Sequence, residues 1–202
     1  MCAIATISDM PEAGAINLTN QFLIAMPGMM DDHFAGAVVY LCEHTERGAL
    51  GLVINRPIDI KLKNLFERVD LSLDRADLAD EPVYFGGPVQ TERGFVLHPR
   101  NLDEPGSYNS TLSIPGGLEM TTSRDVLEAL SHGAGPKKVL ITLGYAGWDA
   151  GQLEEELGRN GWLNVDADPD IIFDTPVEQR YSRALLLLGV DPMMLSQDAG
   201  HA

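Results

Sequence analysis

The hexapeptide YLCEHT, residues 40–45, contains the pair of side chains best suited to nucleophilic chemistry. If this segment is a β-strand, Cys42 and His44 project from one face, because side chains two residues apart on a strand point the same way. A neighbouring histidine can lower the pKa of a thiol, so the pair is a candidate redox-sensing or nucleophilic site. A cysteine in a buried strand is more often a small, inert apolar residue, and we favour that interpretation.

The segment GWDAGQLEEEL, residues 147–157, has the glycines of a phosphate-binding turn between a strand and a helix. Its four carboxylates oppose an anion there, and neither GxGxxG nor GKS/T is present. Helix capping explains the segment better: Asp149 is predicted as the N-cap, and Gln152 completes a capping box. Trp148 then packs on Leu153 as a hydrophobic staple.

The same region is strongly acidic. Residues 148–178 hold nine acidic residues and one basic residue, Arg159. Solvation alone explains such a surface, but the surface also suits docking of a basic protein partner, whose association would slow as salt rises. The docking candidates are Asp149, Glu154, Glu155 and Glu156.

Positive charge is sparse, and the best basic segment spans residues 55–68, with four basic and two acidic residues. A specific nucleic-acid site needs more phosphate contacts than this segment offers, so the sequence gives little support to direct DNA binding. A small anionic ligand is easier to hold, and Arg56 with the adjacent Asn55 is the candidate ligand-binding pair.

Side chains that could ligate a metal ion are scattered over three segments, as Asp31, Asp32, His33, His44 and His98. Two histidines and one carboxylate would suffice for a site, but no local spacing gathers them. The two aspartates next to His33 are typical of helix capping. We therefore predict no metal site and no cofactor.

These side chains must be positioned by a mixture of strands and helices. We expect residues 1–16 to form a flexible arm and residues 17–202 a single domain. Short apolar segments predict strands over residues 21–26, 37–43, 50–55, 82–85, 94–98, 109–114, 118–121 and 137–145. Periodicity and capping signals predict helices over residues 61–69, after Thr122, after Asp149, and from Thr175 to Gly189. This irregular mixture predicts an α+β domain with a mixed sheet.

Composition limits the class of protein. The 202 residues carry a formal net charge of −16, a field that repels phosphate backbones and anionic lipids. The first thirty residues contain no Lys or Arg, and no apolar run is long enough to span a bilayer. The two cysteines, Cys2 and Cys42, are forty positions apart and form no disulfide or zinc motif. We expect a cytoplasmic protein with reduced thiols and no membrane contact.

Four long motifs, taken together, carry a family resemblance. They are NQFLIAMPGMMDDHF from Asn20, YLCEHTERGALGLVINRP from Tyr40, YFGGPVQTERGFVLH from Tyr84 and TLGYAGWDAGQLEEELGRNGWL from Thr142. In this order and spacing the chain resembles the YqgE/AlgH family of bacterial proteins over about residues 17–190. The resemblance implies a strongly bent, bifurcated sheet that closes into a pseudo-barrel flanked by helices. It implies no reaction, and the family's label of transcriptional regulator comes without an assigned DNA-binding element.

The sequence and the resemblance favour a non-enzymatic cytoplasmic regulator that binds a protein or a small anionic ligand. One alternative is a thiol-based redox sensor or small enzyme that uses Cys42 with His44, which requires a pocket containing that thiol. A third hypothesis is direct transcriptional regulation, which requires a continuous positive surface around Lys61 and Arg68. A binding module instead requires an apolar or acidic patch near Trp148.

Overall fold

The structure is a computed structural model that describes residues 16–101 and 108–191. The predicted N-terminal arm therefore lies outside the described residues, except for its last position. Ten strands form within the described ranges: β1 (Gln21–Ala25), β2 (Val38–Thr45), β3 (Gly48–Val53), β4 (Pro57–Lys61), β5 (Pro82–Phe85), β6 (Val89–Pro99), β7 (Thr111–Ile114), β8 (Leu118–Thr121), β9 (Leu140–Asp149) and β10 (Trp162–Asp166). Five helices accompany them: α1 (Leu62–Arg68), α2 (Arg124–Ser131), α3 (Gln152–Gly158), α4 (Pro169–Phe173) and α5 (Val177–Leu187).

Strand β9 joins the two halves of the sheet. Its end, from Ala146 to Asp149, pairs with β3, whereas its beginning pairs with β6 on one edge and with β5 on the other. The hydrogen-bonded order is β10-β1-β2-β3-β9-β6-β8-β7, and β4 extends the branch that starts at β5. The β5–β9 pair is parallel and the other pairs are antiparallel. The sheet is therefore mixed and bifurcated, as predicted.

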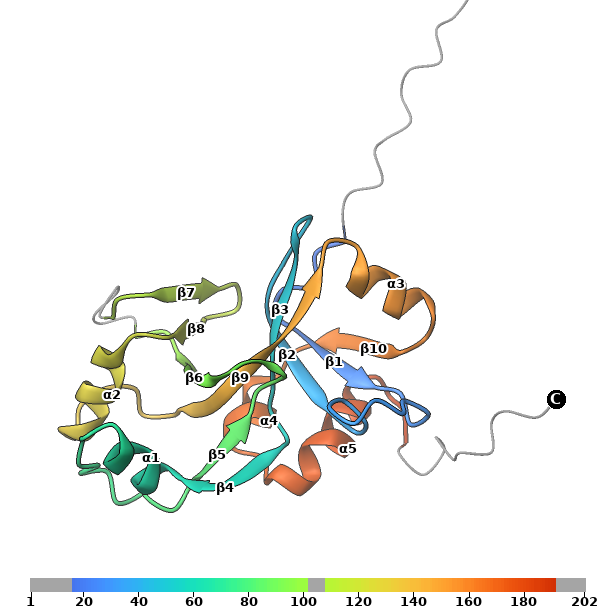
Figure 1. Ribbon diagram of the computed structural model, residues 1–202. Coiled ribbons are helices and arrows are strands. Elements are labelled where there is room, and N and C mark those ends of the chain that lie inside the picture. The colour runs from blue at the N-terminus through green and yellow to red at the C-terminus, as the bar shows by residue number, and fades with distance from the viewer. Residues whose placement is uncertain (1–15, 102–107, 192–202) are drawn as a thin grey trace, which may run out of the picture.

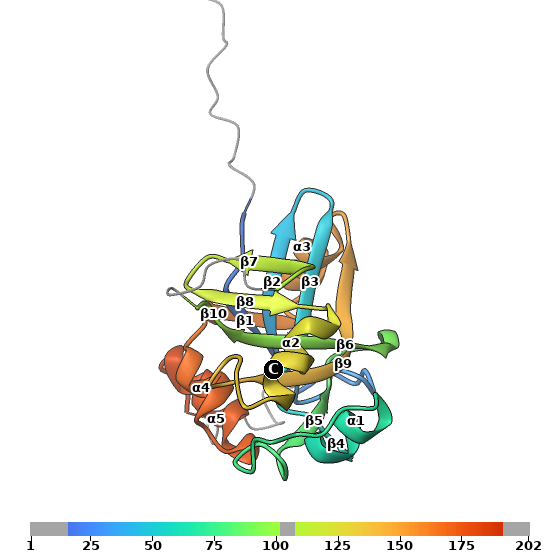
Figure 2. The ribbon, with the colours of Figure 1, turned by 90° about the vertical axis from the view of Figure 1, so that its left-hand side faces the viewer.

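The sheet also bends strongly. In Figure 2 strands β6, β7 and β8 run across the direction of β2 and β3, so the sheet curls into a half-barrel. Helix α3 lies above this sheet in Figure 1, whereas α4 and α5 lie below it. The predicted α+β class with a bent sheet and flanking helices is confirmed.

Glycines at the β5–β6 turn permit its close approach to β9. A Cβ atom on Gly86 would lie 2.2 Å from the carbonyl oxygen of Gly144, and one on Gly87 would lie 2.2 Å from the amide nitrogen of Ala146. Gly87 also has a φ of +151°, a conformation that other residues rarely adopt. The glycine turn in the sequence is therefore required where the two halves of the sheet meet.

Three apolar clusters form the core. The first lies between the sheet and helices α4 and α5 and includes Phe22, Tyr40 and Leu185. The second lies under α3 and contains Trp148, Leu153 and Trp162. The third is covered by α1 and α2. The predicted inward stripe of the last helix is confirmed, because Ala184 and Leu185 are buried in the first cluster and the half-buried Val177, Tyr181 and Leu188 pack against it.

The helix starts differ from the predicted caps. Helix α3 begins at Gln152 with Gly151 as its N-cap, at a φ of +78°, because the predicted cap Asp149 is still paired with Gly48 in β9. Half of the predicted capping box nevertheless forms, since Gln152 Oε1 accepts a hydrogen bond from the Asp149 amide at 3.0 Å. Helix α5 has Pro176 as its N-cap, because the Thr175 hydroxyl instead donates to the Asp170 carbonyl at the end of α4.

The N-cap of helix α2 also lies one residue later than predicted. Its N-cap is Ser123, whereas Thr122 was predicted, because the Thr122 hydroxyl accepts a hydrogen bond from Arg93 at 3.1 Å. Sequence patterns also did not predict β4, β10 or the short helix α4. Each of these elements is five residues long, too short to show a period.

Candidate functional site

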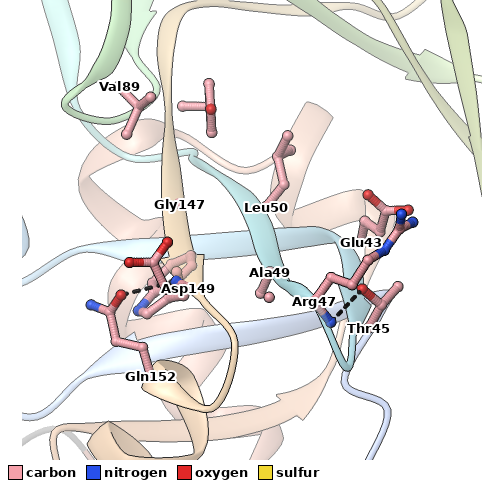
Figure 3. A pocket seen from close by; sticks show the side chains of 12 residues that line it. Glu43, Thr45, Arg47, Ala49, Leu50, Val89, Gly147, Asp149 and Gln152 are labelled. Carbon is pink, nitrogen blue, oxygen red and sulfur yellow. Dashed lines mark hydrogen bonds between the residues drawn. The ribbon is translucent and has the colours of Figure 1, made fainter.

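An open groove of about 670 Å³ lies between the β2–β3 hairpin and the junction of β9 with α3. Figure 3 shows Asp149 and Gln152 on one side of it and Glu43, Thr45 and Arg47 on the other. Ala49 and Leu50 of β3 lie between the two sides, and Val89 and Tyr145 also line the groove. We call this depression the hairpin groove. Its breadth suits an extended segment better than a small molecule that must be enclosed.

A second hollow of about 300 Å³ adjoins the groove on the other side of Trp148. Three aromatic rings meet here: Phe34 lies 6.1 Å from Trp148 and 5.5 Å from Trp162, and the two indoles lie 6.0 Å apart, between ring centroids. Asp31, Glu156 and Arg159 also line this aromatic hollow. The two hollows share Gly147, Trp148 and Gln152, so they form one uneven surface around the start of α3.

Glu156 is the polar centre of the aromatic hollow. One of its carboxylate oxygens accepts hydrogen bonds from the indole nitrogens of Trp148 at 2.9 Å and Trp162 at 2.8 Å. Its other oxygen accepts from the side-chain nitrogen of Gln152 at 2.9 Å. Buried indole N–H groups need such partners, so Glu156 orients both rings and is largely occupied by this task.

Glu154 has a different internal partner, His44. The imidazole Nδ1 accepts a hydrogen bond from the Leu18 amide at 3.0 Å, so the ring proton lies on Nε2, which faces Glu154 Oε1 at 2.9 Å. The His44 side chain is 2% exposed and that of Glu154 is 43% exposed. This contact ties α3 to the end of β2.

Two of the four predicted docking carboxylates are therefore engaged in internal contacts. Asp149 and Glu155 are exposed, and the partner found for Glu155 is the exposed Arg159, the residue that follows α3, at 3.6 Å. Glu43 was not predicted, although it faces Asp149 across the hairpin groove. The available signal was its position opposite Cys42 on the predicted strand, facing away from the core.

The expectation that Cys42 and His44 share a face is wrong. The register of β2 against β3 shifts between Leu41 and Glu43, which makes Cys42 the extra residue of a bulge. Cys42 therefore packs in the first apolar cluster at 1% exposure, whereas His44 points to Glu154 on α3. Burial, with a smaller contribution from Glu43, raises the pKa of the Cys42 thiol. The site thus disfavours the thiolate that nucleophilic chemistry requires.

Arg56 and Asn55 do not form an open ligand site. The Arg56 guanidinium donates to the carbonyl oxygens of Asp32 at 2.9 Å and Ala35 at 2.6 Å. The Asn55 amide accepts from the Val38 amide at 2.8 Å and donates to the Gly36 carbonyl at 2.9 Å. Both side chains fix the loop between β1 and β2, so the predicted anion pair is a structural clamp.

The scattered candidate metal ligands also remain apart. His33 stacks on Phe85, His98 contacts Thr121 and the Pro99 carbonyl, and Asp31 accepts from the His33 and Phe34 amides. Within residues 16–101 and 108–191 no three His, Cys, Asp or Glu side chains are arranged to hold a metal ion.

The basic segment over residues 55–68 does not form a continuous positive surface. Lys63 pairs with Asp80 at 3.3 Å, and Lys61 donates to the Asp80 carbonyl at 2.9 Å. The depression that contains Arg68 is also lined by the acidic residues Asp59 and Glu67. The arrangement lacks the run of unpaired cations that phosphate contacts require.

The sequence model of the AlgH-like family matches residues 22–193, which is most of the chain. The chain belongs to this family. A UPF0301 protein of Ralstonia nicotianae is 69% identical over 187 residues, covering 93% of this chain and 96% of that protein. A UPF0301 protein of Burkholderia cenocepacia is 68% identical with the same coverage. The family resemblance carried by the four motifs is confirmed.

Two solved structures agree with this fold. The solution structure of the AlgH protein from Pseudomonas aeruginosa is 52% identical, with a TM-score of 0.74, over 96% of this chain and 100% of that one. A crystal structure of a Corynebacterium diphtheriae protein, 20% identical, shares the fold with a TM-score of 0.66 over 88% of this chain and 89% of that one. None of the helices in the described part of this AlgH-like chain combines the length and hydropathy needed to cross a bilayer.

Proposed function

We propose that this AlgH-like protein is a non-enzymatic, cytoplasmic binding module that docks a basic segment of a protein partner at the start of α3. The observation that carries the proposal is the surface made by the hairpin groove and the aromatic hollow. Four carboxylates and two guanidinium groups line these two hollows, and the exposed Glu155 adds a further negative charge beside them. Opposite charge on a partner would guide its approach and fix its orientation.

The chemistry of the groove favours binding over catalysis. Cys42, the one described cysteine, is buried in the core and is not among the residues that line the groove. The groove instead combines the exposed carboxylates Glu43 and Asp149 with the half-buried ring of Tyr145. Aromatic anchors surrounded by charged side chains are typical of protein interfaces.

The aromatic hollow would supply the specificity of the same surface. Aromatic rings attract the cationic ends of Lys and Arg, and nearby carboxylates strengthen the attraction. Asp31 and Glu156 lie in the same hollow as the rings of Phe34, Trp148 and Trp162. A basic side chain that enters here would contact rings and carboxylates together.

The proposal is tested by capturing partners from the protein's own cytosol with two charge-matched double variants. Glu43→Gln with Asp149→Asn removes two carboxylates from the hairpin groove. Asp59→Asn with Glu67→Gln removes two exposed carboxylates beside α1 and is the control. We expect a partner retained by the parent and by the control but lost by the groove variant, and released as salt rises. Equal capture by all three proteins, or capture indifferent to salt, would contradict the proposal.

A further inference from the structure

The guanidinium group of Arg180 on α5 is buried without a carboxylate partner. The residue is 6% exposed, its Nε donates to the Thr175 carbonyl at 3.0 Å, and its Nη1 donates to the Ile54 carbonyl. The group lies 5.0 Å from the centroid of the Tyr84 ring. No ion pair among the described residues includes Arg180. A buried charge that is hydrogen-bonded to backbone carbonyls and has no ion-pair partner is costly, so an additional anion would be favourable here.

Arg180 lines a cavity of about 170 Å³ between the sheet and helices α4 and α5. Lys137 and Lys138, just before β9, line the same cavity, and Glu81 is the one carboxylate among its lining residues. Lys138 already pairs with Asp174, whereas Lys137 forms no ion pair with a described residue. The cavity therefore presents two cations that form no ion pair with a described residue, beside the single carboxylate of Glu81, in a protein whose net charge is −16.

The size of the cavity limits what it can hold. Water occupies roughly 30 Å³ per molecule in the liquid, so the space corresponds to about five or six waters. Drug-sized ligands and nucleotides need larger pockets, of roughly 300 Å³ or more. The apolar residues Leu140 and Ile172 also line it, so a bound anion would be partly shielded from water. Such shielding strengthens charge-assisted hydrogen bonds.

We propose that this cavity binds one small oxyanion, a phosphate or a short carboxylate, held by Arg180 and Lys137. The guanidinium presents a planar set of donors that matches two anion oxygens, and Lys137 supplies a second charge at the rim. This site takes the role that the sequence assigned to Arg56. It lies on the α4–α5 side of the sheet, away from the surface around α3, so either site can fail without the other.

The test is a titration of the isotope-labelled full chain with inorganic phosphate, and separately with succinate, against chloride at equal ionic strength. We expect saturable amide shifts at Tyr84, Lys138 and Arg180. Tighter binding of phosphate would identify a phosphate site, and tighter binding of succinate a carboxylate site. Absence of saturable shifts at these residues with both anions would overturn the proposal.

Variants separate the site from general charge effects. We expect Arg180→Gln to abolish saturable binding and Lys137→Gln to weaken it about fivefold. Lys63→Gln, which removes the same charge from an exposed lysine outside the cavity, should leave the affinity unchanged. If Arg180→Gln does not fold, the affinities of Lys137→Gln and Lys63→Gln still test the site, because Lys137 is exposed. Equal affinities for Lys137→Gln and Lys63→Gln would contradict the assignment.

Discussion

The two sides of the sheet pair their charged side chains in opposite ways. Under α3, the carboxylate of Glu156 accepts from two buried indoles, and that of Glu154 meets His44. On the α4–α5 side, the guanidinium of Arg180 has backbone carbonyls and a ring as its neighbours. A charged side chain whose hydrogen-bond partners are complete is part of the architecture, whereas a buried one without a counter-charge is a candidate site. The comparison therefore separates the structural carboxylates of α3 from the exposed ones that remain available to a partner.

The largest expected effect is on the architectural side. We expect Glu156→Ala to lower the free energy of unfolding by about 3 kcal/mol, because two buried indole N–H groups lose their acceptor. Urea unfolding followed by tryptophan fluorescence measures this loss directly. The control Glu155→Ala removes a neighbouring exposed carboxylate and should change stability by at most about 0.5 kcal/mol. Similar losses in the two variants would show that Glu156 is not structural.

A smaller loss is expected at Arg180. Arg180→Met removes hydrogen bonds to two carbonyls but also removes a buried charge that has no carboxylate partner, so the two effects partly cancel. We expect the free energy of unfolding to fall by about 1 to 2 kcal/mol in chloride buffer. A loss as large as that of Glu156→Ala would indicate that the neighbours of the Arg180 guanidinium compensate its charge as well as those of the Glu156 carboxylate do. The proposed difference between the two sides of the sheet would then be wrong.

A buried histidine on β6, His98, makes the stability of the protein depend on pH. Its neighbours are the Pro99 carbonyl at 3.0 Å and the Thr121 hydroxyl at 2.9 Å, and burial lowers its pKa below the usual value. The unfolded chain therefore takes up a proton before the folded protein does, and stability that is present above pH about 6.5 is lost as pH falls through the lowered pKa.

The His98→Gln variant isolates this effect. We expect the stability of the parent, relative to that of the variant, to fall below pH about 6.5 by at most about 1.4 kcal/mol per pH unit, the limit for one proton. Urea unfolding of both proteins between pH 7.5 and 5 provides the comparison. Parallel pH profiles would mean that another group dominates in this range.

Much of the architecture was predictable because its patterns are local. Apolar runs located eight of the ten described strands, and the inward stripe of α5 followed from helical periodicity. The predictions that were wrong depended on how strands pair with one another. Cys42 is the extra residue of a bulge in β2, so it faces away from His44, and no spacing in the sequence encodes that bulge. Asp149 could not cap α3 because pairing with Gly48 extends β9 through it.

The candidate sites were also only partly predictable from local patterns. Trp148 and the carboxylates around it drew attention to the start of α3, but the opposite wall at Glu43 and Arg47 comes from a hairpin about a hundred residues away. Arg180 did carry a local signal, since it lies three residues after Val177 and four before Ala184, on the stripe predicted to be buried.

The location of the docking surface can be measured directly by amide hydrogen exchange of the full chain, alone and with its captured partner. We expect slower exchange in the complex at residues 43–50 of the β2–β3 hairpin and residues 145–152 at the start of α3. Unchanged exchange in both segments, with protection instead around residues 55–68, would contradict it.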